Sequence, residues 1–192
     1  MNSDELRGTL EFLRAAERLK DVSRTSWTSR GARESVAEHT WRLCLMAVVL
    51  ERELPELDFA RLLKICVVHD LGEAIGGDIS APEQPEEGKA ADEREDLVRL
   101  LEPLPDEVRS EILSLWDEYE GARTAEARIA KALDKLETIL QHNQGENPPD
   151  FDYGFNLEYG REYTAGEPLI EAIRDALDRE TREREARGRE SP

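Results

Sequence analysis

Apolar residues recur every three or four positions along most of this chain, a spacing that favours α-helices, and the alternation typical of strands is absent. The first helix is expected over about residues 4–20, where Leu6, Leu10 and Leu13 lie on one face. Further helices are expected over residues 36–54, 59–70, 90–101, 107–119, 125–140 and 168–178. The sequence therefore predicts an all-α helical bundle.

The length of 192 residues is enough to bury a substantial core in one domain. We expect that domain to span residues 1–178. The remaining residues, 179–192, are mostly charged and are expected to form a C-terminal tail, either as solvated helix or as disordered chain.

Three stretches interrupt the helical pattern. Residues 21–34 have no period and carry Arg24, Trp27 and Arg30 in an otherwise acidic protein, which fits either a surface loop or a segment beside a binding site. Residues 80–88 contain two prolines and are expected to form a loop. Residues 143–166 combine Gly, Pro, Asn and Asp with aromatic side chains. They predict an irregular, aromatic-rich segment before the C-terminal helix.

The stretch from His69 to Asp78 contains polar residues that folding alone explains poorly. His69 and Asp70 follow an apolar run and are expected to be buried, which costs several kcal/mol unless a charged or hydrogen-bonding partner compensates. A cation is one such partner. If the helix continues through residue 71, Glu73 lies on the same face as His69. Gly76 and Gly77 then break the helix and can return Asp78 to the same place.

Each candidate ligand also has a simpler explanation. The His-Asp pair can cap a helix C-terminus, where the helix dipole favours histidine. His39 lies on the apolar face of its helix, as many hydrogen-bonded core histidines do. Asp134 can pair with Lys131 or Lys135 on a solvated face. Taken together, however, two imidazoles and two carboxylates from three predicted helices suit a divalent cation with open positions for water and substrate.

Composition limits the classes of partner. The net charge of −18 argues against nucleic acid or an anionic membrane surface, because both require a positive face. Neither a basic, apolar N-terminal signal nor an apolar run of about 18 residues is found. Cys44 and Cys66 lie in apolar helical stretches, as reduced core cysteines do. We therefore expect a cytoplasmic protein.

Three motifs carry a family resemblance. Glu-Ser-Val-Ala-Glu-His at 34–39, His-Asp-Leu-Gly-Glu-Ala-Ile-Gly-Gly-Asp-Ile at 69–79 and Leu-Asp-Lys-Leu-Glu at 133–137 resemble the HD-domain metal-dependent phosphohydrolase superfamily. With Arg-Thr-Ser-Trp at 24–27, they look like the branch that contains the 5′-deoxynucleotidases. The motifs cover most of residues 20–145. The resemblance implies an HD-domain helical bundle that forms a homodimer.

The resemblance also implies roles for individual residues. The implied metal ligands are His39, His69, Asp70 and Asp134, holding one divalent ion per chain such as Mn, Co, Mg, Ni or Fe. Glu73 matches the acid/base carboxylate, and Asp78 matches an additional active-site carboxylate. Arg24 and Trp27 match substrate-contacting residues that are adjacent in bacterial members but are separated here by Thr25 and Ser26. Arg24 or Arg30 is expected to orient the phosphate.

The function that follows is hydrolysis of a phosphomonoester. The expected enzyme is a 5′-nucleotidase that removes phosphate from (deoxy)ribonucleoside 5′-monophosphates with broad base tolerance. One alternative is a nucleoside triphosphate or cyclic-nucleotide hydrolase of the same fold. Another is a catalytically silent HD module that binds a nucleotide or a partner helix. The presence of Glu73 together with all four candidate ligands favours an enzyme.

Overall fold

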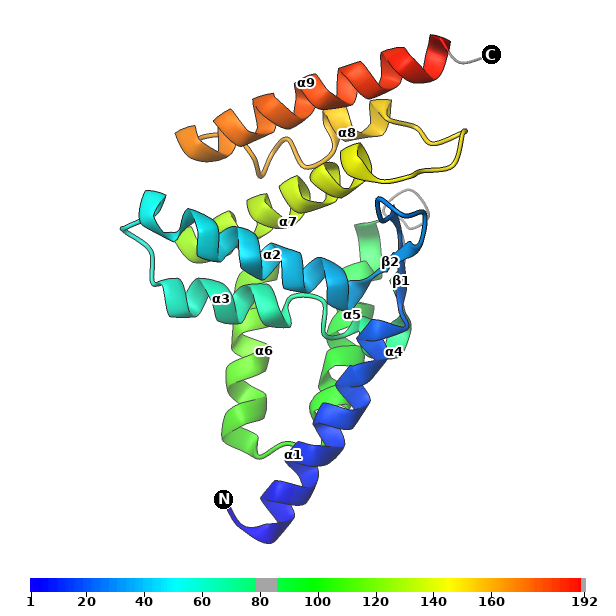
Figure 1. Ribbon diagram of the computed structural model, residues 1–192. Helices are drawn as coiled ribbons and strands as arrows, with labels where there is room; N and C mark the ends of the chain where they lie inside the picture. Colours follow the sequence, from blue (N-terminus) through cyan, green and yellow to red (C-terminus); the bar gives the residue numbers. More distant parts are fainter. Residues whose placement is uncertain (79–85, 191–192) are drawn as a thin grey trace.

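The computed structural model describes residues 1–78 and 86–190, and it is largely helical (Figure 1). The helices are α1 (Ser3–Ala16), α2 (Val36–Leu50), α3 (Phe59–Val68), α4 (Glu73–Gly76), α5 (Glu86–Leu101), α6 (Asp106–Gly121), α7 (Ala125–Gln144), α8 (Gly154–Glu158) and α9 (Pro168–Glu190). Short 3₁₀ segments follow two of them, η1 (Glu17–Lys20) and η2 (Glu51–Glu53). The predicted all-α class is confirmed.

Side-chain caps begin the helices where the sequence indicates. Ser35 accepts a hydrogen bond from the Glu38 backbone, and Glu38 accepts one in return, which completes a capping box at α2. Asp58 caps α3 and Thr124 caps α7. The C-terminal ends differ more, because α1 and α2 each tighten into 3₁₀ turns before they finish. Of the loop expected over 80–88, residues 80–85 lie outside the described residues, and the remaining three are helical because α5 begins at Glu86.

The segment 21–34 differs from the expectation of a loop without strands. Strand β1 (Ser23–Trp27) pairs antiparallel with β2 (Arg33–Ser35). The strands are five and three residues long, and a register shift between Ser23 and Trp27 interrupts any alternation of side chains. Contacts distant in sequence also fix this hairpin, since the amide of Glu146 donates to the Thr28 carbonyl at 3.0 Å. Neither the register shift nor the contact with Glu146 can be recognised in a short window of sequence.

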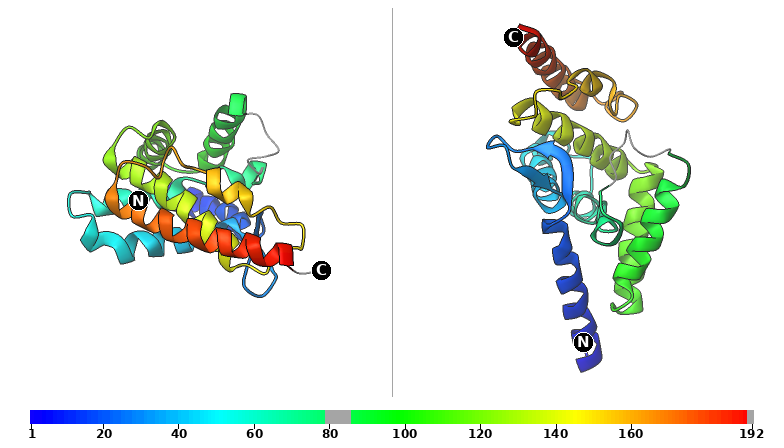
Figure 2. Two further views of the ribbon diagram at one scale, coloured as in Figure 1. Left: turned by 90° about the horizontal axis from the view of Figure 1, so that it is seen from above. Right: turned by 90° about the vertical axis from the view of Figure 1, so that its right-hand side faces the viewer.

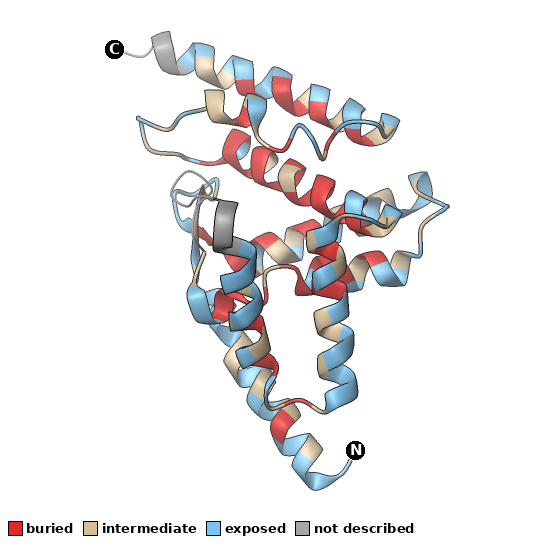
Figure 3. Cartoon of the chain, turned by 180° about the vertical axis from the view of Figure 1, so that it is seen from behind, coloured by how far each residue is buried: buried red, intermediate tan, exposed pale blue. Residues whose placement is uncertain are grey.

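Helix α7 forms the centre of the molecule. It packs against α2, α3, α6 and α9, and most of its residues are buried (Figures 1 and 3). Leu133, Leu136 and Ile139 are fully buried on it. Helix α1 extends away from this body (Figure 2). None of the helices formed by the described residues has the length and apolar character needed to cross a membrane.

The aromatic-rich segment connects α7 to α9 and is fixed by one buried arginine. Arg174 of α9 donates to the carbonyl oxygens of Asn156, Leu157 and Tyr159 at 2.7–2.9 Å and pairs with Asp178 at 2.7 Å. A buried guanidinium with this many acceptors is well compensated. Helix α9 continues to Glu190, so the charged tail expected from residue 179 onward is helical as far as that residue.

Candidate functional site

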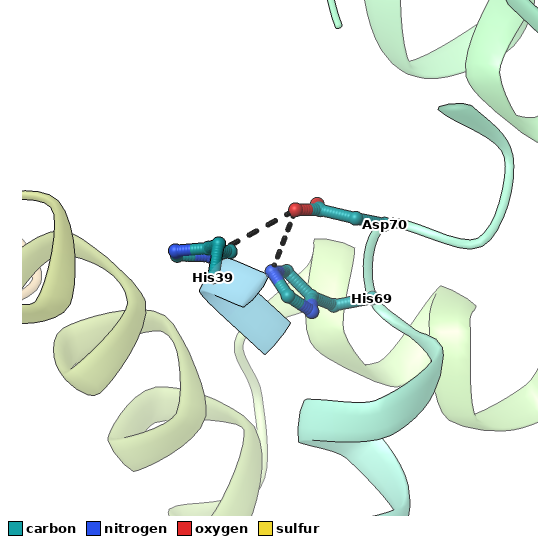
Figure 4. Close-up of side chains that lie close together, drawn as sticks. All are labelled: His39, His69 and Asp70. Atoms are coloured by element: carbon teal, nitrogen blue, oxygen red, sulfur yellow. Dashed lines mark ion pairs between the residues drawn. The ribbon is translucent and has the colours of Figure 1, made fainter. Parts of the chain in front are cut away.

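Three helical elements bring the four candidate ligands together. His39 comes from α2, His69 and Asp70 follow the end of α3, and Asp134 comes from α7. Figure 4 shows both imidazoles turned toward the Asp70 carboxylate. His69 Nε2 lies 3.0 Å from Asp70 Oδ2, and His39 Nε2 lies 3.9 Å from the same oxygen and 3.2 Å from Asp134 Oδ1.

The two histidine Nε2 atoms fit a cation. Both are buried and make no hydrogen bond to any part of the chain that the structure describes. His69 Nδ1 lies 2.9 Å from the Cys66 carbonyl, so it donates there and leaves a lone pair on Nε2 facing a carboxylate. Two donors at right angles, each about 2.1 Å from a shared cation, lie about 3 Å apart. The nitrogen–oxygen distances therefore suit a mid-series or hard divalent ion.

His39 is oriented by Glu137, a residue to which the sequence motif gave no role. His39 Nδ1 contacts Glu137 Oε2, and Arg42 Nε donates to Glu137 Oε1 at 2.6 Å. Glu137 is fully buried. A carboxylate on Nδ1 fixes the tautomer that presents the Nε2 lone pair to a metal. The signal in the sequence is a glutamate three residues after Asp134 on a helix face that is otherwise buried.

A second acidic group, Glu34 and Glu137, lies on the other side of His39, and arginine side chains already pair with both carboxylates. One oxygen each of Glu34 and Glu137 lies within 4.8 Å of a His39 nitrogen. Arg24 Nε is 3.5 Å from Glu34 Oε2, and Arg42 bonds Glu137. Two guanidinium groups therefore compensate the two carboxylates, and we assign this group to positioning rather than to a second metal.

Asp134 combines the two explanations that its sequence left open. Lys135 Nζ pairs with Oδ2 at 2.9 Å, but the carboxylate is buried rather than solvated. Tyr119 donates its hydroxyl to the same oxygen at 2.7 Å, which leaves Oδ1 facing His39. Although burial opposes ionisation, Lys135 and the two histidines hold the pKa of Asp134 well below its usual range. It is therefore an anionic donor.

Glu73 reaches the site by a different path from the one expected. Helix α3 ends at Val68 instead of continuing through Leu71, and i+3 turns lead to the short helix α4. Glu73 is nevertheless buried, and its Oε2 makes no hydrogen bond within the described chain. Burial and the charges of Asp70 and Asp78 raise the pKa of Glu73 to about 10, so its carboxyl carries a proton at neutral pH.

Asp78 follows the glycine pair that ends helix α4. Gly77 ends α4 with φ +79°, a conformation that a side chain would strain. The charge of Asp78 acts on both Glu73 and Arg24, which brings it into the same electrostatic cluster.

The structure separates the three predicted substrate residues. Arg24 faces the ligand cluster, with Nη1 3.6 Å from Asp70 Oδ2 and Nη2 donating to Thr138 Oγ1 at 3.0 Å. Trp27 lies at the end of β1, where its ring contacts Phe151 and the guanidinium of Arg33. Arg30 is exposed in the hairpin turn.

Comparison with known proteins identifies relatives over most of the chain. A family model described as HD domain matches residues 16–174. The 5′-deoxynucleotidase HDDC2 of Homo sapiens is 38% identical over 144 residues, which cover 73% of this chain and 70% of that protein. The 5′-deoxynucleotidase hdd1 of Schizosaccharomyces pombe is 36% identical over 148 residues, which cover 73% and 74%.

Solved structures agree with the sequence relatives. A predicted metal-dependent phosphohydrolase from Magnetospirillum magnetotacticum has a TM-score of 0.81 at 27% identity, covering 95% of this chain and 97% of that one. The PH0347 protein from Pyrococcus horikoshii has a TM-score of 0.71 at 26% identity, covering 89% and 99%. These likenesses confirm the resemblance seen in the motifs. The chain belongs to the HD-domain family, in the branch whose curated relatives are 5′-deoxynucleotidases.

Proposed function

We propose that this protein is a metal-dependent 5′-nucleotidase that removes phosphate from nucleoside 5′-monophosphates, with deoxyribonucleotides preferred. The observation that carries the proposal is the pair of buried Nε2 atoms of His39 and His69, which face the carboxylates of Asp134 and Asp70 beside Arg24. The names of the relatives support the same reaction.

Each residue has a part in this reaction. His39, His69, Asp70 and Asp134 would hold the divalent ion. When bound, the ion neutralises charge on the phosphoryl group and lowers the pKa of a coordinated water. The guanidinium of Arg24 can donate paired hydrogen bonds to phosphate oxygens, and Arg30 adds positive charge at the hairpin turn.

Glu73 can serve as the general acid. Its proton can be delivered to the 5′ oxygen as the phosphorus–oxygen bond breaks, so that the nucleoside leaves as an alcohol. Asp78 supports this role, because its negative charge helps to keep the proton on Glu73. Since the ion and Arg24 act on groups that all nucleoside monophosphates share, we propose that the common bases are all accepted.

We expect one tightly bound divalent ion per chain. Ligand atoms of His39, His69 and Asp70 lie within 4.8 Å of one another, Asp134 Oδ1 lies 3.2 Å from His39 Nε2, and the carboxylates behind His39 are compensated by arginines. The third histidine, His142, is bonded to Asn156 rather than to the ligand cluster. The measurement is the ratio of metal to protein after gel filtration, with the metal determined by elemental analysis. Two ions per chain within about 4 Å of one another, as in two-metal sites, would contradict it.

The reaction is tested by phosphate release from dAMP and AMP. If Trp27 covers the 2′ carbon, a ribose hydroxyl is buried without a partner at a cost of about 1 to 3 kcal/mol. We therefore expect kcat/KM to favour dAMP by roughly 10-fold to 100-fold. Trp27→Ala should reduce this ratio, whereas Arg24→Ala should weaken both substrates alike. Equal rates on dAMP and AMP would refute the sugar preference, and pyrophosphate release from dATP alone would refute monophosphate hydrolysis.

We further propose that two copies associate through the outer face of α2. Trp41, Leu45, Val48 and Val49 lie there at helical spacing, and between 42% and 71% of each side chain is exposed. A contiguous apolar stripe is typical of a contact surface, and a two-fold axis makes such a stripe complementary to itself. Sedimentation equilibrium of the full chain measures this association.

The proposed setting is cytoplasmic, with a small nucleotide rather than a nucleic acid as partner. Cys44 and Cys66 are both free, as is usual in a reducing compartment. The net charge of −18 would repel a polyanion, whereas one phosphate needs only the local positive charge of Arg24.

A further inference from the structure

A second group of buried polar atoms without partners lies around His142, apart from the ligand cluster. His142 Nε2, Asn147 Oδ1 and Asn156 Nδ2 make no hydrogen bond to the described residues. His142 is 5% exposed and Asn156 is fully buried. Buried polar groups are rarely left unpaired, because each costs about 1 to 3 kcal/mol. In this chain the same property marks the two imidazoles of the proposed metal site.

The hydrogen bonds that these side chains do make define what is missing. His142 Nδ1 lies 2.7 Å from Asn156 Oδ1, so it donates there and leaves Nε2 as an acceptor. Asn147 Nδ2 donates to the His142 carbonyl at 2.6 Å and to the Tyr153 hydroxyl at 2.9 Å, which leaves Oδ1 as an acceptor. Two acceptors, His142 Nε2 and Asn147 Oδ1, therefore lack a donor, and the Asn156 Nδ2 donor lacks an acceptor.

The position of His142 follows from two elements that run side by side. Arg24, at one end of β1, donates to Thr138 of α7, and Gln141 of α7 donates to the Trp27 carbonyl at the other end of β1. Asp134, Thr138 and His142 are four residues apart and share one face of α7. At 1.5 Å per residue, His142 lies about 12 Å along the helix from Asp134. That separation is comparable to the length of an extended nucleoside monophosphate.

Aromatic rings lie between Trp27, at the end of β1, and His142 of α7. The Trp27 and Phe151 ring centroids are 6.2 Å apart, and Phe151 lies 4.8 Å from His142 and 4.9 Å from Tyr153. Trp27, Phe151 and Tyr153 are only half-buried, whereas His142, which packs edge to face against Phe151, is buried. Partly exposed aromatic rings beside buried hydrogen-bonding groups are typical of sites that bind a planar heterocycle.

We propose that this cluster binds the nucleobase and that His142 Nε2 and Asn147 Oδ1 accept hydrogen bonds from its exocyclic amino group. The proposal rests on the nucleotidase function above and narrows the broad base tolerance to a preference for amino-bearing bases. Phe151 covers His142, so the base enters as the Phe151 ring turns aside. Side chains near the surface change rotamer within nanoseconds, so this motion does not limit turnover.

Matched substrates test the proposal directly. dCMP carries an amino group at the ring position where dUMP carries a carbonyl, and dAMP and dIMP differ in the same way. We expect kcat/KM to favour dCMP over dUMP, and dAMP over dIMP, by about 5-fold to 30-fold, the scale of one satisfied against one unsatisfied buried hydrogen bond. A ratio near 1, or a preference for dUMP and dIMP, would overturn the proposal.

Variants of His142 separate recognition from structure. His142→Phe keeps a ring against Phe151 but removes the acceptor, so the dCMP to dUMP ratio should fall to about 1. His142→Gln retains an acceptor and should keep most of the ratio. Deoxyribose 5-phosphate, which has no base, is the control substrate. If His142→Phe lost the same factor on dCMP, dUMP and deoxyribose 5-phosphate, the residue would be structural and the proposal wrong.

The same assay separates failure of the proposed base site from failure of the proposed nucleotidase function. Phosphate release from dCMP and dUMP at equal rates would overturn the base site and leave the nucleotidase function standing. Release from none of the nucleotides would overturn both.

Discussion

Replacing Glu73 by glutamine is expected to lower kcat/KM by about 100-fold or more, the usual contribution of a positioned acid or base, while the protein keeps its metal ion. The reason is geometric. Glu73 is buried beside Asp70 without being one of the four proposed ligands, and its Oε2 has no partner among the described residues. Glutamine has the same shape but cannot deliver the proton.

The measurement is phosphate release from dAMP together with metal content after gel filtration. His69→Ala and Asp70→Ala are the matched variants, because each removes a proposed ligand and should lose metal and activity together. Thermal unfolding of all three proteins shows whether they remain folded. A Glu73→Gln protein with activity within a few-fold of wild type would remove Glu73 from the reaction. An Asp70→Ala protein that retained its ion would remove Asp70 from the ligand set.

The candidate ligands could be selected from the sequence because their signals are local. The run before His69 predicts burial, and a charge after a buried run calls for a partner. Capping residues placed the helix starts for the same reason, since Ser35 and Glu38 interact within one turn. The structure then needed only to bring α2, α3 and α7 into contact. It does so through their buried apolar faces.

What the sequence did not predict depends on contacts that are distant along the chain. The hairpin β1–β2 is held by residues near position 141–146, and its register shift hides any alternation. The role of Glu137 depends on its contacts with Arg42 and His39, which both lie on helix α2. Trp27 lies three residues after Arg24 in the same motif, yet its ring contacts Phe151, which lies 124 residues later in the chain.

Glu137→Gln is expected to weaken metal binding by about 10-fold to 100-fold, the usual effect of removing a carboxylate that orients a ligating histidine. The carboxylate accepts on both oxygens, one bonded by Arg42 and one by His39 Nδ1. Glutamine must keep its oxygen toward Arg42, because the guanidinium only donates. Its amide nitrogen then faces His39, which favours a proton on Nε2.

A proton on Nε2 has a partner available. Asp134 Oδ1 lies 3.2 Å from His39 Nε2, so the wrong tautomer can be stabilised in the position that the ion would otherwise occupy. Titration of the metal-depleted variant with Mn²⁺ or Co²⁺ by calorimetry measures the affinity. Nitrogen chemical shifts of the His39 ring report the tautomer independently of activity.

The double variant Glu137→Gln with Arg42→Met provides the decisive control. Without the guanidinium, the glutamine amide is free to turn its oxygen toward His39 Nδ1 and restore the tautomer. We therefore expect the double variant to bind metal more tightly than Glu137→Gln alone, a coupling that a double-mutant cycle measures. A loss that was the same with and without Arg42 would mean that Glu137 acts by charge alone. Its hydrogen bond would then play no part in presenting His39 to the ion.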